Sequence, residues 1–181
     1  MSEQVAEPEP QLAAPAPPAA PRHAVADVLV VLGVLLAVGI ACGVLWWLLV
    51  DPAQFTKVRD GGAMGEVQLG RRFDADGWFA VLGLLAGGLA GGALTWWRSR
   101  DPLLTAGLLV LGSVLAAAAM ALVGRLLGPG DPTAALAAAA PGSHVPVRLA
   151  VSAKTAYLVW PIAVLGGSLL VLWSKPLEPE L

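Results

Sequence analysis

Residues 71–100 read RRFDADGWFAVLGLLAGGLAGGALTWWRSR, and this stretch decides the fold. Arginines and aspartates give way to an uncharged run over residues 77–97, and charge returns at Arg98 and Arg100. As a helix rising about 1.5 Å per residue, the run reaches across a bilayer hydrocarbon core of about 30 Å. The stretch is therefore predicted to be a membrane span with polar residues at both ends.

The composition of the whole chain indicates the same class of protein. Hydrophobic residues make up 57% of the 181 residues and charged residues only 13%, and the mean hydropathy is +0.73. Soluble proteins carry about 25% charged residues. The additional hydrophobic residues are concentrated in four long apolar stretches, which predict spans at 28–50, 77–97, 102–126 and 155–174. The predicted fold is an all-α integral membrane protein with a bundle of four transmembrane helices.

The segments outside the spans predict a simple organisation. Residues 1–27 are rich in Ala, Pro and Glu, so they are predicted to be a disordered tail, ahead of a transmembrane domain over 28–174. A second short tail covers 175–181. Both tails are predicted to be cytoplasmic, because Arg98 and Arg100 concentrate positive charge in a connection of about five residues. The longer loops carry more Lys and Arg in total, which counts against this orientation. The predicted location is the plasma membrane.

The two longer loops, predicted to be extracytoplasmic, contain local structure signals. In the first, alternating runs at 55–58 and 66–69 flank a pair of glycines, which predicts a small β-hairpin. In the second, Asp131 can cap a short helix with Pro132 at its first position.

Asp74 and Asp76 lie directly before the second span and resemble the start of a calcium loop. The glycine and glutamate that such a loop requires further on are replaced here by apolar residues, so a metal site is not predicted. Asp76 is predicted to cap the helix that begins directly after it, and Asp74 to pair with Arg71 or Arg72. The candidate contacts to lipid or to a protein partner are Arg71, Arg72, Asp74 and Arg125.

Small residues recur along the predicted spans, often at four-residue spacing. This spacing places them on one face of a helix, and such faces let membrane helices approach closely. A phosphate-binding loop would need a preceding strand and a Lys-Ser/Thr pair, which are missing from the sequence here. The candidate helix-packing residues are Gly39, Gly43, Gly83, Gly87, Gly91 and Gly112.

The sequence gives no pattern for catalysis, a cofactor or nucleic-acid binding. The histidines have no neighbours at ligand spacing, the serines have no adjacent base, and the acidic pI of about 5.6 comes without a basic patch. The centres of the spans carry no ionisable residue of the kind that ion and proton pathways use. Pro161 is expected to kink the fourth span.

Two functions are compatible with this sequence. The first is a non-enzymatic component of a cell-envelope membrane assembly, embedded in the lipid bilayer and in contact with a membrane or envelope protein, with oligomerisation as a further option. The alternative is a small transporter or permease subunit for an apolar or lipid-like cargo, which would need no charge within the spans.

Several short motifs resemble a family of small four-span membrane proteins from actinobacteria. They are the Ala/Pro-rich tail, the tryptophan pair at 46–47, FDADGWF at 73–79, WWRSRDP at 96–102 and VWP at 159–161. The resemblance covers about 28–174. That family is a domain of unknown function, and some of its members carry a permease label. The resemblance implies a plasma-membrane location and transfers no catalytic residue.

Overall fold

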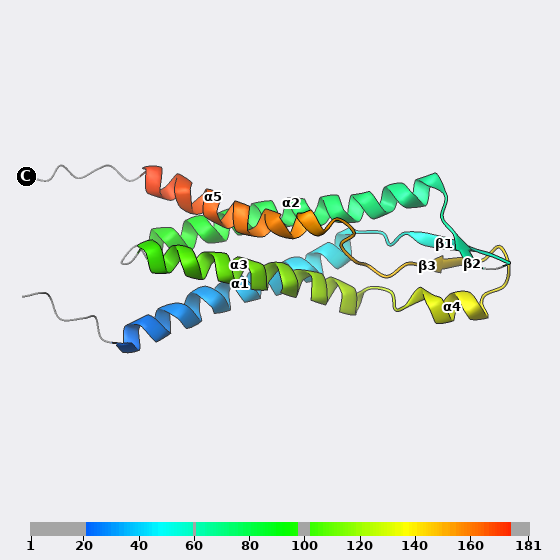
Figure 1. Ribbon diagram of the computed structural model, residues 1–181, viewed down its shortest axis with the longest axis horizontal. Coiled ribbons are helices and arrows are strands. Elements are labelled where there is room, and N and C mark those ends of the chain that lie inside the picture. The colour runs from blue at the N-terminus through cyan, green and yellow to red at the C-terminus, as the bar shows by residue number, and fades with distance from the viewer. Residues whose placement is uncertain (1–20, 60, 98–101, 175–181) are drawn as a thin grey trace, which may run out of the picture.

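The computed structural model describes residues 21–59, 61–97 and 102–174, which are mostly helical. Four helical segments in this part are long and apolar enough to cross a membrane, as predicted. They run side by side as a bundle (Figure 1). They are α1 (Pro21–Leu49), α2 (Glu66–Trp97), α3 (Pro102–Leu127), and the short 3-10 helix η1 (Lys154–Leu158) continued by α5 (Val159–Ser174).

The helix starts differ from the predicted ones in two places. α1 begins at Pro21 rather than at residue 28, since proline suits the first helical turn and the residues after it are compatible with a helix. α2 begins at Glu66 rather than at residue 77. Charged residues end a membrane span, but Glu, Gln, Leu and Arg are good helix formers, so the helix continues beyond the apolar zone. The predicted tail residues 1–20 and 175–181 lie outside the described residues.

The bundle consists of two closely packed helix pairs, α1 with α3 and α2 with α5. Glycines line the first contact. A Cβ added to Gly39 would lie 2.5 Å from the carbonyl oxygen of Ala116, and one added to Gly43 would lie 2.8 Å from that of Met120. Gly112 of α3 lies against the side chains of Leu32 and Leu35 of α1. Because larger side chains at these positions would overlap atoms of the facing helix, the three glycines permit the close approach of the two helices.

The second contact uses the glycine face of α2. Gly83 lies against the indole of Trp160, Gly87 against α5 one turn further on, and Gly91 against the backbone of Val164. The glycine face of α2, which the four-residue spacing predicted, therefore packs against α5.

Buried hydrogen bonds join helices across the bundle. The hydroxyls of Thr95 and Ser168 lie 2.6 Å apart and connect α2 to α5. The Trp46 indole Nε1–H donates to the carbonyl oxygen of Ala75 at 2.8 Å and connects α1 to α2. Trp46 is fully buried, whereas Trp47 is exposed. Of the tryptophan pair at the end of α1, only Trp47 is exposed on the surface of the bundle.

Pro161 lies in the first turn of α5 rather than inside a continuous helix. The first amides of an α-helix have no intrahelical acceptor, so the missing proline N–H costs no hydrogen bond there. The chain changes from the 3-10 helix η1 to the α-helix α5 just before the proline.

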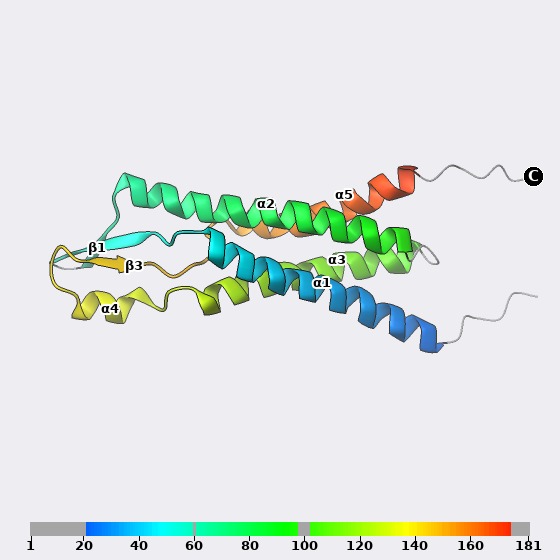
Figure 2. The ribbon, with the colours of Figure 1, turned by 180° about the vertical axis from the view of Figure 1, so that it is seen from behind.

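The two long loops fold together into one unit, named here the cap (residues 51–76 and 128–153). It lies at the end of the bundle opposite to Pro21 and Ser174 (Figure 1, Figure 2). An antiparallel sheet in the order β2-β1-β3 joins the two loops, since β3 comes from the second. The cap contains β1 (Gln54–Val58), β2 (Gly61–Ala63), α4 (Pro132–Ala138), β3 (His144–Pro146) and the first turns of α2.

The cap differs from the predicted loops in two respects. The second strand of the hairpin is 61–63, whereas 66–69 form the first turn of α2, so the strand predicted there was wrong. The strand β3 was not predicted, because its pairing with a distant loop leaves no local signal. In the second loop Asp131 caps α4: its carboxylate accepts hydrogen bonds from the backbone N of Thr133 at 3.0 Å and from its hydroxyl at 2.6 Å.

Candidate functional site

Asp76 connects α2 to the second loop of the cap. This residue of α2 is buried, and its two carboxylate oxygens accept hydrogen bonds from the backbone N–H groups of Ser152 at 2.8 Å and Ala153 at 3.0 Å. Hydrogen bonds to an ionised acceptor are among the stronger ones in proteins. The prediction that Asp76 is the N-terminal capping residue of its own helix was wrong, because α2 begins more than two turns earlier. Asp76 instead holds the segment that leads into η1.

A second charged group lies on the far side of the cap. Arg148 Nη2 is 3.7 Å from Asp131 Oδ2, and Arg125, in the last turn of α3, has an exposed side chain. The hydrogen bonds from Thr133, and to a smaller extent the charges of Arg148 and Arg125, lower the pKa of Asp131 below its usual value. Asp131 therefore stays ionised at neutral pH and fixes the start of α4.

The predicted ion pair of Asp74 with Arg71 or Arg72 is not formed. Arg72 Nη2 instead lies 3.4 Å from the hydroxyl of Ser152. Within residues 21–59, 61–97 and 102–174, the side chains of Arg71 and Asp74 make no hydrogen bond or ion pair. The same is true of Asp51, which follows the end of α1 and was not among the predicted site residues.

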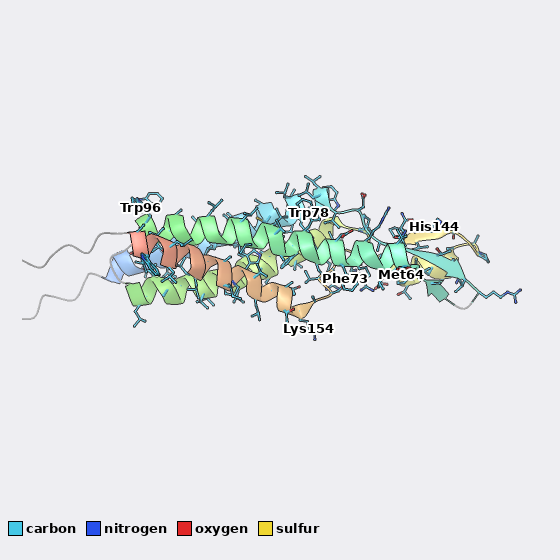
Figure 3. The ribbon with its side chains drawn as sticks, turned by 90° about the horizontal axis from the view of Figure 1, so that it is seen from above. Met64, Phe73, Trp78, Trp96, His144 and Lys154 are labelled. Atoms are coloured by element: carbon cyan, nitrogen blue, oxygen red, sulfur yellow. The ribbon has the colours of Figure 1, made fainter. Side chains whose placement is uncertain are left out.

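These unpaired charges share a cleft between the end of α1 and the side of α2, named here the charged cleft. Its larger lobe has a volume of about 230 Å³ and is lined by Leu49, Val50, Asp51, Arg71, Asp74 and Trp78. A smaller lobe of about 20 Å³ shares Asp51 and Arg71 and adds Arg72 and Arg148. Figure 3 shows Trp78 on α2 near the cap and Trp96 at the other end of the helix.

An apolar groove runs along the bundle between α2 and α5. Its volume is about 840 Å³, and its lining of leucines, glycines, alanines and single Ile, Val and Trp residues carries no charge. The exposed side chains of Leu89 and Ile162 belong to it.

No protein-family model, curated protein or solved structure matches the chain. No group of three or more His, Cys, Asp or Glu in the described part of the chain is arranged to hold a metal ion. The features with potential function are the cap, the charged cleft and the apolar groove.

Proposed function

We propose that the protein is a non-enzymatic component of a cell-envelope membrane assembly and that its cap binds a partner protein. The observation that carries the proposal is the construction of the cap: strands from both loops share one sheet, and α2 continues without a break from the cap into the bundle. Such a unit holds a binding surface in a fixed position relative to the membrane.

The first turns of α2 offer a contact surface for that partner. Val67 is 74% exposed and Phe73 68% exposed, although both lie in the cap, beyond the uncharged part of the helix. Large apolar side chains that are exposed outside the uncharged part of a span are candidates for contact with a protein partner. Large aromatic side chains are also enriched among the residues that contribute most to binding.

The proposed orientation places the cap outside the plasma membrane and both ends of the chain in the cytoplasm. The density of positive charge at Arg98 and Arg100 supports it. The resemblance to the actinobacterial four-span family stays a prediction.

Purification from cells in a mild detergent tests the partner proposal. The full-length protein is expected to retain one partner in stoichiometric amount, and Phe73→Ala is expected to reduce its recovery about tenfold, the effect of removing one strong contact. Leu89→Ala is the matched control, because it truncates an equally exposed apolar side chain on the lipid-facing part of α2. Recovery that is unchanged by Phe73→Ala and Val67→Ala would exclude this surface.

A second candidate function, a small transporter or permease subunit for an apolar or lipid-like cargo, is supported by the groove between α2 and α5. A volume of about 840 Å³ without charge suits an acyl chain better than a polar solute. Lipid flux that depends on the protein in reconstituted vesicles would favour transport. Stable partner binding without such flux would favour the assembly component.

A further inference from the structure

Three charged side chains of the charged cleft lack partners among the described residues. Arg71, Asp51 and Asp74 line the same larger lobe, yet no ion pair joins the arginine to either aspartate. The lobe of about 230 Å³ has room for a small group, since a water molecule takes up about 30 Å³ in the liquid. Opposite charges that share a cleft without pairing are suited to a ligand that carries both signs.

The two signs are unevenly distributed along the cleft. Arg71 and Asp51 line both lobes, and the smaller lobe adds Arg72 and Arg148, the latter 3.7 Å from Asp131, so arginines outnumber aspartates on that side. Guanidinium groups match the geometry of phosphate oxygens. The larger lobe holds Asp51 and Asp74 beside the C-terminal end of α1, where the helix dipole adds partial negative charge. That side favours an ammonium group.

The cleft lies where the apolar parts of α1 and α2 end, which is where a lipid head group is expected in a bilayer. Its lining includes Leu49 and Trp78, which are 44% and 41% exposed at the ends of the apolar parts of α1 and α2. Tryptophan favours the boundary between hydrocarbon and water. A lipid of the adjacent leaflet can therefore place its head group in the cleft while its acyl chains lie along the bundle.

We infer that the charged cleft binds a phospholipid whose head group is phosphoethanolamine. Within the larger lobe the phosphate contacts Arg71, and the primary ammonium donates hydrogen bonds to Asp51 and Asp74. A choline head group lacks those N–H donors, and a glycerol head group lacks the positive charge. The inference does not rest on partner binding by Phe73, so either can fail without the other.

Native mass spectrometry of the full-length protein tests the inference with three probes that share the same acyl chains: phosphatidylethanolamine, phosphatidylglycerol and phosphatidylcholine. Wild-type protein is expected to retain phosphatidylethanolamine about tenfold better than the other two. Arg71→Gln, and the double variant Asp51→Asn/Asp74→Asn, are each expected to remove this preference, since a hydrogen bond to a charged group contributes about a tenfold factor or more. Arg59→Gln and Glu66→Gln are the controls, because both residues are exposed and lie outside the cleft.

The tested side chains make no bond within the described residues, so the variants are expected to keep the thermal stability of the wild type. Glycerophosphoethanolamine, the same head group without acyl chains, is expected not to displace the bound lipid at equal concentration. Displacement by it would assign the cleft to a soluble ligand and overturn the lipid inference. Equal retention of all three lipids, or a preference that survives both cleft variants, would overturn it as well.

Discussion

Replacing Gly91 with isoleucine is expected to separate α2 from α5 and to lower the free energy of unfolding by about 1 to 3 kcal/mol, the range for overpacking a filled interior. A Cβ at this position would lie inside van der Waals contact with the backbone of Val164, whose Cα and carbonyl carbon are both 2.8 Å away. A backbone cannot turn aside as a flexible side chain can. In lipid, moreover, close packing supplies much of the attraction between helices.

Thermal unfolding of the purified variants in detergent measures this effect. Gly33→Ile is the matched control, because the space around Gly33 is open and its helix should gain slightly from the loss of a glycine. Leu89→Ile, at a side chain that is 76% exposed, is expected to be nearly silent. Equal losses for Gly91→Ile and Gly33→Ile would contradict the close contact of α2 with α5.

Asp76→Ala is expected to lower the free energy of unfolding by about 3 kcal/mol, since the change removes two hydrogen bonds to a charged acceptor and leaves two backbone donors without partners. Asp76→Asn is expected to cost about half as much, because the amide retains one acceptor oxygen and directs its NH₂ group at the other donor. The cost arises at the entry to η1, more than seventy residues away in the sequence.

Hydrogen exchange locates this effect. The amides of Ser152 and Ala153 are expected to lose protection in Asp76→Ala, while those in the middle of α3 keep theirs. Asp74→Ala is the control, because Asp74 is exposed and makes no bond within the described residues. Unchanged protection at Ser152 and Ala153 would show that Asp76 does not hold this segment.

The four spans could be predicted from the sequence because length and the absence of charge are local properties of a segment. The role of Asp76 could not. An aspartate before an apolar run is the usual sign of a helix cap, but residues 66–75 are compatible with a helix and carry α2 past it. Its true partners are brought near only by the folding of the second loop.

Helix faces could likewise be predicted, but not the partners of those faces. The spacing of Gly83, Gly87 and Gly91 defines one side of α2, yet nothing in it selects α5 over the other helices. Trp46 and Trp47 could not be told apart in the sequence, since both end the first apolar run. In the structure Trp46 is buried and Trp47 is exposed, because adjacent residues point about 100° apart around a helix. In the charged cleft, Arg71 and Asp74 were predicted as candidates, whereas Asp51 and Arg148 join them only through the tertiary fold.

Labelling of single cysteines in intact cells tests most directly the proposal of a four-span protein with its cap outside. In a Cys42→Ala background, Gly130→Cys places a thiol at an open, exposed position of the cap, and Ser99→Cys places one in the connection between α2 and α3. A maleimide that cannot cross membranes is expected to label Gly130→Cys in intact cells and Ser99→Cys only after the cells are permeabilised. Labelling of Ser99→Cys in intact cells, with Gly130→Cys protected, would contradict the proposed orientation, and labelling of both would contradict the membrane-spanning bundle.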